Sequence, residues 1–131
     1  MASLVDYQVL SDGSFELNGD LDIKFLEFSL PSDFTVGTFR AKPILMWRVK
    51  PLSSSVRYQI GVNDPQHLQS KSEGQRTYSN AANNPDGVWE AISGEKFNAG
   101  KSNSIYFMTV NSSSRIRVND VILWYQRGSG S

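Results

Sequence analysis

The sequence predicts an all-β protein, an antiparallel sandwich or barrel of eight to ten short strands. Runs rich in β-branched and aromatic residues recur at spacings of about ten residues, and most alternate between apolar and polar side chains. Clusters of Gly, Pro, Asn, Asp and Ser separate these runs, as expected of turns. No segment has a convincing helical pattern, and no repeat of fixed period indicates a propeller or solenoid.

The first two predicted strands, Leu4–Leu10 and Ser14–Asn18, are expected to pair as a hairpin around Ser11-Asp12-Gly13. The apolar residues of the first strand, from Val5 to Val9, occupy odd positions and therefore share one face. The segment Asp22–Leu30 fits either a strand with a bulge or two helical turns. We favour the strand because a proline ends the run and its neighbours resemble strands.

The middle of the chain supplies the predicted centre of the sandwich. Phe34–Arg40 alternates across a glycine kink. Ile44–Lys50 is apolar on both faces, which predicts a central strand. Val56–Val62 alternates, so that its apolar residues point inward and Arg57 and Gln59 point outward.

A polar, turn-rich stretch from 63 to 86 follows, and Arg76–Ser79 is a short edge strand predicted within it. A connection of this length without regular structure is unusual in a compact domain and is usually functional or disordered. The next predicted strand is Gly87–Ile92, where alternation resumes.

The closing segment, Ser104–Gln126, holds the largest apolar mass of the chain and is predicted to be the spine of the core. It divides into two strands, Ile105–Val110 and Arg115–Gln126, around a Ser-rich turn. The positions of the apolar residues change at Asn119-Asp120. This change predicts either a bulge there or a strand that passes from a half-exposed position into one buried on both faces.

Length and composition limit the classes of function. At 131 residues we expect one domain over 1–127, with a flexible Gly-Ser tail over 128–131. The absence of cysteine excludes disulfides and thiolate metal ligands. Thirteen basic residues balance thirteen acidic ones, so dedicated nucleic-acid binding is not expected. Neither a signal peptide nor a membrane-spanning run is visible, and a soluble protein, cytoplasmic or secreted, is expected.

The end of the chain resembles jelly-roll carbohydrate-binding modules and related lectin-like domains. The residues that carry this resemblance are Val88-Trp89-Glu90, Phe97-Asn98-Ala99-Gly100, Asn103–Phe107 and Ile116–Trp124. The resemblance implies a sugar-binding jelly roll, and it transfers no specific binding residue. Many such modules hold a structural Ca²⁺; Glu90 and Asp120 are available here, but no ligand cluster can be identified in the sequence.

Catalysis is not expected. His67 is the one histidine, and no nucleophile motif accompanies it, so we interpret it as a structural or incidental loop residue. The carboxylates are scattered, whereas glycoside hydrolysis needs two at a defined separation. The Gly100-Lys101-Ser102 order lacks the spacing of a phosphate loop and is interpreted as a turn.

The strongest functional signal is a set of aromatic and amide residues, since sugars bind to aromatic faces flanked by amides, carboxylates or Arg. We interpret Trp47 and Trp124 as core residues, and leave Trp89 open between core and site. The predicted ligand-binding residues are Trp89, Tyr78, Asn63, Asp64, Asn83, Asn84, Asp86, Arg57 and Gln59. Arg57, Gln59 and the neighbouring Arg48 are alternative hydroxyl ligands if their face is concave.

Two functions lead, and a third, a small hydrolase or lyase, would need carboxylates clustered in space. The first is a noncatalytic, lectin-like module that binds a glycan or polysaccharide. The second is a structural module that forms homo-oligomers or docks on a protein partner, which apolar residues on both faces of several strands would suit.

Overall fold

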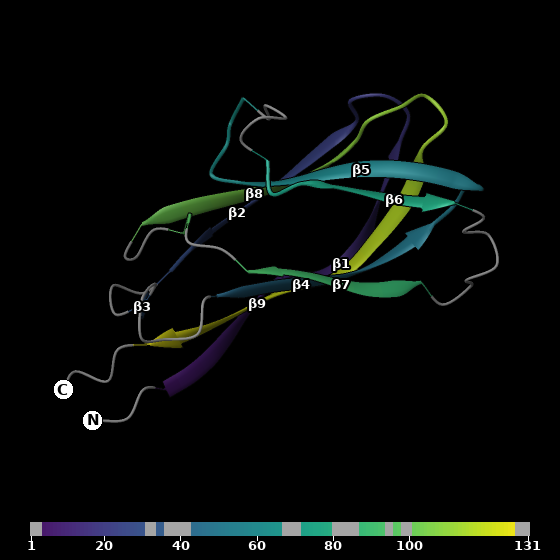
Figure 1. Ribbon diagram of the computed structural model, residues 1–131. Helices are drawn as coiled ribbons and strands as arrows, with labels where there is room; N and C mark the ends of the chain where they lie inside the picture. The colour runs from purple at the N-terminus through teal and green to yellow at the C-terminus, as the bar shows by residue number, and fades with distance from the viewer. Residues whose placement is uncertain are drawn as a thin grey trace.

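Two antiparallel sheets packed face to face make up the protein (Figure 1). The computed structural model describes residues 4–30, 34–35, 43–66, 72–79, 87–93, 96–97 and 101–127. The strands are β1 (Leu4–Asn18), β2 (Ile23–Ser29), β3 (Phe34–Thr35), β4 (Ile44–Pro51), β5 (Ser55–Val62), β6 (Gln75–Ser79), β7 (Val88–Ser93), β8 (Ser102–Thr109) and β9 (Arg115–Arg127). The predicted all-β sandwich is confirmed.

We call the two layers the large sheet and the small sheet. The large sheet has the order β1-β9-β4-β7, with the short β3 also paired to β9. The small sheet has the order β2-β8-β5-β6. Each sheet therefore has an inner face that contacts the other layer and an outer face that points away from it (Figure 1).

The core lies between the inner faces. Leu45, Trp47 and Val49 alternate along β4 and are fully buried, as predicted. The Trp47 indole Nε1 donates a hydrogen bond of 3.0 Å to the Tyr58 hydroxyl across the layers, and the Trp47 ring meets Phe107 edge-on at 5.3 Å between centroids. The indole N–H thus has a partner in the apolar interior, where an unpaired donor would be costly.

The predicted hairpin of the first two strands is wrong. Residues 4–18 form a single strand, β1, which pairs with β9 along its whole length. The Ser11-Asp12-Gly13 segment lies in register shifts of this pairing and does not reverse the chain. A long partner strand offers continuous hydrogen bonding to both halves, so the turn residues are accommodated as an irregularity.

Strand β2 pairs with β8 without a register shift, so the helical alternative for Asp22–Leu30 and the expected bulge within it are both wrong. Of the predicted strand Phe34–Arg40, the described part is β3, and the remainder lies outside the described residues. The predicted tail at 128–131 also lies outside them. Among the described residues, no helix is long and apolar enough to span a membrane.

The predicted bulge in the last strand is confirmed. Between Met46 and Arg48, the pairing of β4 with β9 shifts register, and Asp120 adopts a φ of 55° at this position. Asp tolerates the left-handed conformation better than most residues, because its short side chain can bond locally. The inner residues on both sides of the bulge, Val118 and Val121, remain fully buried. The extra residue therefore keeps both halves of β9 facing the core.

Candidate functional site

A row of polar and aromatic side chains crosses the outer face of the large sheet. Arg48 lies opposite Trp89 of β7 on one side and opposite Asn119 of β9 on the other. Arg48 points outward because its neighbours in the strand, Trp47 and Val49, point into the core. We call Trp89, Arg48, Asn119 and Asp120 the arginine row.

The arginine row holds its guanidinium between a ring and a carboxylate. The Arg48 Cζ lies 6.0 Å from the Trp89 ring centroid, and Arg48 Nη2 lies 3.4 Å from Asp120 Oδ2. Both ionised side chains are about two-fifths exposed, at 39% and 40%, so their attraction adds little to the free energy of unfolding. The geometry instead leaves hydrogen-bonding groups beside an indole ring that is 50% exposed.

Asn119 adds an unused acceptor to the arginine row. Its Oδ1 is buried and has no hydrogen-bond partner among the residues that the structure describes. Most buried polar atoms in folded proteins are paired, so an unpaired one needs an explanation.

Exposed apolar side chains gather further along the same face, and we call Tyr7, Val9, Ile44 and Trp124 the apolar end. The rings of Tyr7 and Trp124 lie 5.2 Å apart, and these two residues are directly opposite in the β1–β9 pairing. Trp124 lies opposite Ile44, four residues along β4 from Arg48. At about 3.3 Å per residue, the Tyr7–Trp124 pair therefore lies ~13 Å from Trp89 along the strand direction.

The apolar end corrects one expectation. Trp124 was expected in the core, yet it is 38% exposed, and its Nε1 donates to Met46 Sδ at 3.0 Å. The apolar face predicted for the first strand lies on the outside, with Tyr7 55% exposed. In β9 the core is filled by the residues of opposite parity, Leu123 and Tyr125, which leaves Trp124 on the outer face.

The outer face of the small sheet differs at its centre, where Gln59 and Tyr106 are buried. Gln59 was expected to point to solvent, but it is 1% exposed. Its Nε2 donates to the Tyr106 hydroxyl at 2.7 Å, and its Oε1 accepts from Gln75 Nε2 at 3.0 Å. The Tyr106 ring lies over Gly61, where an added Cβ would come within 2.1 Å of it. This face is therefore a packed polar layer.

Two predicted site residues follow β5. Asn63 connects separate segments: its Nδ2 donates to Lys96 O at 2.7 Å, and its Oδ1 accepts from the Ser104 N–H at 2.9 Å. Asp64 is 4% exposed, and its Oδ2 has no hydrogen-bond partner within the described ranges. Burial raises the pKa of Tyr106, the Gln59 hydrogen bond lowers it, and the charge of Asp64 raises it further. The two hydrogen bonds of Asn63 to backbone atoms of other segments give this residue a structural role.

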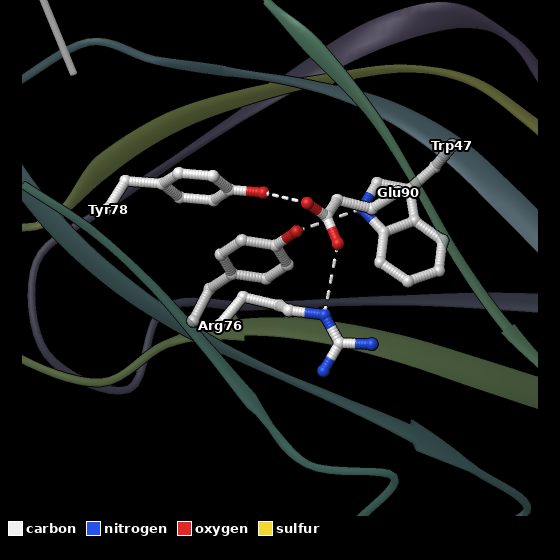
Figure 2. A network of polar contacts seen from close by, with 5 residues as sticks. Trp47, Arg76, Tyr78 and Glu90 are labelled. Atoms are coloured by element: carbon white, nitrogen blue, oxygen red, sulfur yellow. Dashed lines mark hydrogen bonds and ion pairs between the residues drawn. The ribbon is translucent and has the colours of Figure 1, made fainter.

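A third polar cluster links the edges of the two sheets (Figure 2). Glu90 of β7 accepts hydrogen bonds from the Tyr78 hydroxyl and from Arg76 Nε, the latter at 3.2 Å. The ring of Tyr78 stacks on Tyr58 at 6.3 Å between centroids, which places this cluster against the Trp47–Tyr58 pair in the core. Burial, followed by the hydrogen bond to Glu90, raises the pKa of Tyr78.

The structure distributes the predicted site residues over several regions. Trp89 lies in the arginine row, Arg57 is exposed on the small sheet, and Tyr78 lies at the sheet edges. Asn83, Asn84 and Asp86 lie outside the described residues. Sequence reasoning did not assign Asn119 or the apolar end to a site. The outward parity of Arg48 was the signal available, since it marks the face that its cross-strand neighbours share.

No group of three or more His, Asp or Glu side chains suited to a metal ion occurs among the described residues. No cofactor is predicted from the sequence, and the structural Ca²⁺ that the resemblance allows stays unassigned. Glu90 is paired to Arg76, and Asp120 is paired to Arg48. Any function assigned to the arginine row is based on its ring, its guanidinium and its oxygen atoms.

No protein-family model and no curated sequence matches the chain. Solved structures do share its fold, at low sequence identity. The protein is similar to a xylan-binding module CBM15 (TM-score 0.60, 11% identity, 97% of this chain and 99% of that chain). It is also similar to the CBM36-1 domain of a multidomain xylanase from the hindgut metagenome of Trinervitermes trinervoides (0.54, 11%, 98% and 100%).

A third similar structure is dimeric latent PorU from Porphyromonas gingivalis (TM-score 0.65, 5% identity). The match covers 98% of this chain but 13% of that one, so the chain spans a small part of that protein. At these identities the likeness establishes the fold, a jelly-roll-like sandwich of the kind seen in carbohydrate-binding modules.

Proposed function

We propose that the protein is a noncatalytic carbohydrate-binding module that holds a glycan chain on the outer face of its large sheet. The observation that carries the proposal is the arginine row, where an exposed indole lies beside Arg48, Asp120 and Asn119. A sugar ring presents C–H groups to an aromatic face and hydroxyls at its rim, and the row offers a partner for each.

The two aromatic groups support recognition of a chain and not of a single sugar. Their separation of ~13 Å along β4 exceeds the width of one pyranose ring, so one ligand can contact both only if it is an oligosaccharide. The similar modules named above include one described as xylan-binding and one from a xylanase, which makes xylan the first polymer to test.

Binding to soluble xylan and to a wider panel of neutral polysaccharides tests the proposal. We expect Trp89→Ala to weaken binding by ~30-fold, equivalent to about 2 kcal/mol for loss of an aromatic contact. Phe25→Ala is the matched control, because Phe25 is an exposed aromatic residue on the small sheet. Equal loss in both variants, or no binding by the folded protein to any polysaccharide, would overturn the proposal.

A second candidate, a module that associates with itself or with another protein, is favoured by the apolar end. Tyr7, Val9, Ile44 and Trp124 form a cluster of large exposed apolar groups, and such clusters often mark interfaces. Light scattering distinguishes the candidates: an oligomer that dissociates in Trp124→Ser, with no polysaccharide bound by wild type, supports association.

A further inference from the structure

Positive charge is concentrated on the outer face of the large sheet beyond the arginine row. Lys50 lies directly opposite Arg117 in the pairing of β4 with β9. Arg48 lies two residues from Lys50, and Arg115 lies two residues from Arg117, so that both share this face. We call Arg48, Lys50, Arg115 and Arg117 the basic band.

Ion pairs engage two of the four cations of the basic band. Glu16 pairs with Arg117 at 3.2 Å, and Asp120 pairs with Arg48 at 3.4 Å. The other two cations, Lys50 and Arg115, have no ion pair with a described carboxylate, in a chain whose total charge is balanced. Asp22, in the connection between β1 and β2, uses its carboxylate to accept from the Asn18 N–H at 2.9 Å.

Two members of the basic band remain available to a ligand. Lys50 makes no ion pair with any described carboxylate, and Arg115 donates to the neutral Asn18 Oδ1 at 3.0 Å. Like charges directly opposite in a sheet, such as Lys50 and Arg117, are destabilising. Departures from such local rules are expected at functional sites, where a ligand supplies the missing charge.

We infer that the glycan bound by this face is an acidic polysaccharide, whose carboxylate or sulfate groups contact the basic band while a sugar ring stacks on Trp89. This inference rests on the proposed function and specifies its class of ligand. The face fits a sparsely charged chain better than a nucleic acid, because Glu16 and Asp120 interrupt the band and would repel closely spaced phosphates.

Pairs of polymers that differ in charge alone test the inference. Polygalacturonate is compared with its carboxyl-reduced form, and dextran sulfate with dextran, so that the two pairs distinguish carboxylate from sulfate. Oligothymidylate represents nucleic acid, and xylan serves as the neutral reference. We expect an acidic polymer to bind roughly tenfold more tightly than its neutral partner at low salt, with the difference shrinking as salt screens the charges.

Substitutions in the basic band test which residues produce the preference for acidic polymers. Lys50→Gln combined with Arg117→Gln should abolish the preference for the acidic polymer and leave neutral binding unchanged. The control combines Lys24→Gln with Lys101→Gln, which removes two exposed positive charges elsewhere in the chain and changes the net charge equally. The control should bind as wild type does. Removing an opposed pair of like charges should not destabilise the fold, so circular dichroism should show both variants folded.

Every other outcome of these experiments contradicts the inference, and one of them contradicts the proposed function as well. Equal binding to charged and neutral polymers overturns the inference and leaves the proposed function standing. Loss in the control variant as large as in the test variant shows an effect of net charge alone and overturns it too. Binding of oligothymidylate as tightly as of the acidic polymer, lost with the same two substitutions, identifies a general polyanion surface and overturns it as well. If no polysaccharide binds, charged or neutral, the proposed function fails together with the inference.

Discussion

The outer faces of the two sheets use similar residue types in opposite ways. On the large sheet, Trp89 and Tyr7 are half exposed, and Arg48 lies at the surface with Asp120. On the small sheet, Tyr106 and Gln59 are almost fully buried and hydrogen-bonded to each other. The first face has groups available to a ligand, whereas the polar groups of the second mainly satisfy one another. The same residue types are therefore exposed on one face and packed against one another on the other.

We expect the largest difference between the two faces when one glycine on each sheet is replaced by alanine and the free energy of unfolding is measured. Gly61→Ala on the small sheet would place a methyl group within 2.1 Å of the Tyr106 ring, and this overpacking should cost about 3 kcal/mol in the free energy of unfolding. Gly13→Ala in β1 meets no atom within 4 Å and should change stability by less than ~1 kcal/mol. Urea denaturation measures both, and similar values would show that Tyr106 is loosely packed.

Two tyrosine hydroxyls provide the next test. Tyr106→Phe removes the acceptor of the Gln59 amide inside a packed layer and should cost about 1–2 kcal/mol. Tyr7→Phe removes an exposed hydroxyl of the large sheet and should stay within ~0.5 kcal/mol of wild type. Thermal unfolding of the two variants under one set of conditions gives the comparison. A Tyr7 variant as unstable as the Tyr106 variant would contradict it.

Alkaline pH should unfold the protein through its buried phenols. Burial raises the pKa of Tyr58, Tyr78 and Tyr106, so the folded state retains these protons more strongly than the unfolded chain does. The resulting stabilisation is fully present below the ordinary tyrosine pKa of about 10 and is lost as pH rises above it. Denaturation midpoints measured at stepped pH should fall above ~10, and less steeply in Tyr106→Phe. A flat profile would show that the phenols are not buried.

The smallest expected effect on stability concerns the bulge at Asp120. Asp120→Gly removes a side chain from a residue with a φ of 55° and should stabilise the fold by about 0.5 kcal/mol. The same variant loses the carboxylate beside Arg48, so polysaccharide affinity should fall. Asp120→Asn retains a residue tolerated in this conformation and separates the two effects. Unchanged affinity in both variants would exclude this carboxylate from the site.

The strand pattern and the inner core could be predicted from the sequence because alternation reports which residues share a face. The parity of β4 and the bulge at Asp120 were both predicted in this way, and so was the packing of Trp47. Alternation does not report which face is buried when both are apolar, and this is why Trp124 was expected in the core. Nor does it report that Tyr106 packs over Gly61 and encloses Gln59, since that contact joins two strands far apart in sequence.

The candidate site was predictable in its chemistry but not in its location. Trp89 was singled out because of its indole beside a polar stretch, and Arg48 was noted as an alternative hydroxyl ligand. The row that joins them to Asn119 depends on the register of β4 between β7 and β9, which a sequence alone does not fix. Pairing partners set the neighbours on a sheet, so a site on a sheet face is the part hardest to predict.

The pairing of β1 with β9 has a consequence for synthesis of the chain. Leu4 is opposite Arg127, so β1 pairs with a strand that is synthesised well after it. At 5–20 residues per second, β1 must wait on the order of ten seconds for its partner. Such non-local pairing also predicts slow folding, on a scale of roughly milliseconds to seconds once the chain is complete. During that interval β1 lacks its partner strand, and its apolar side chains are not covered by β9.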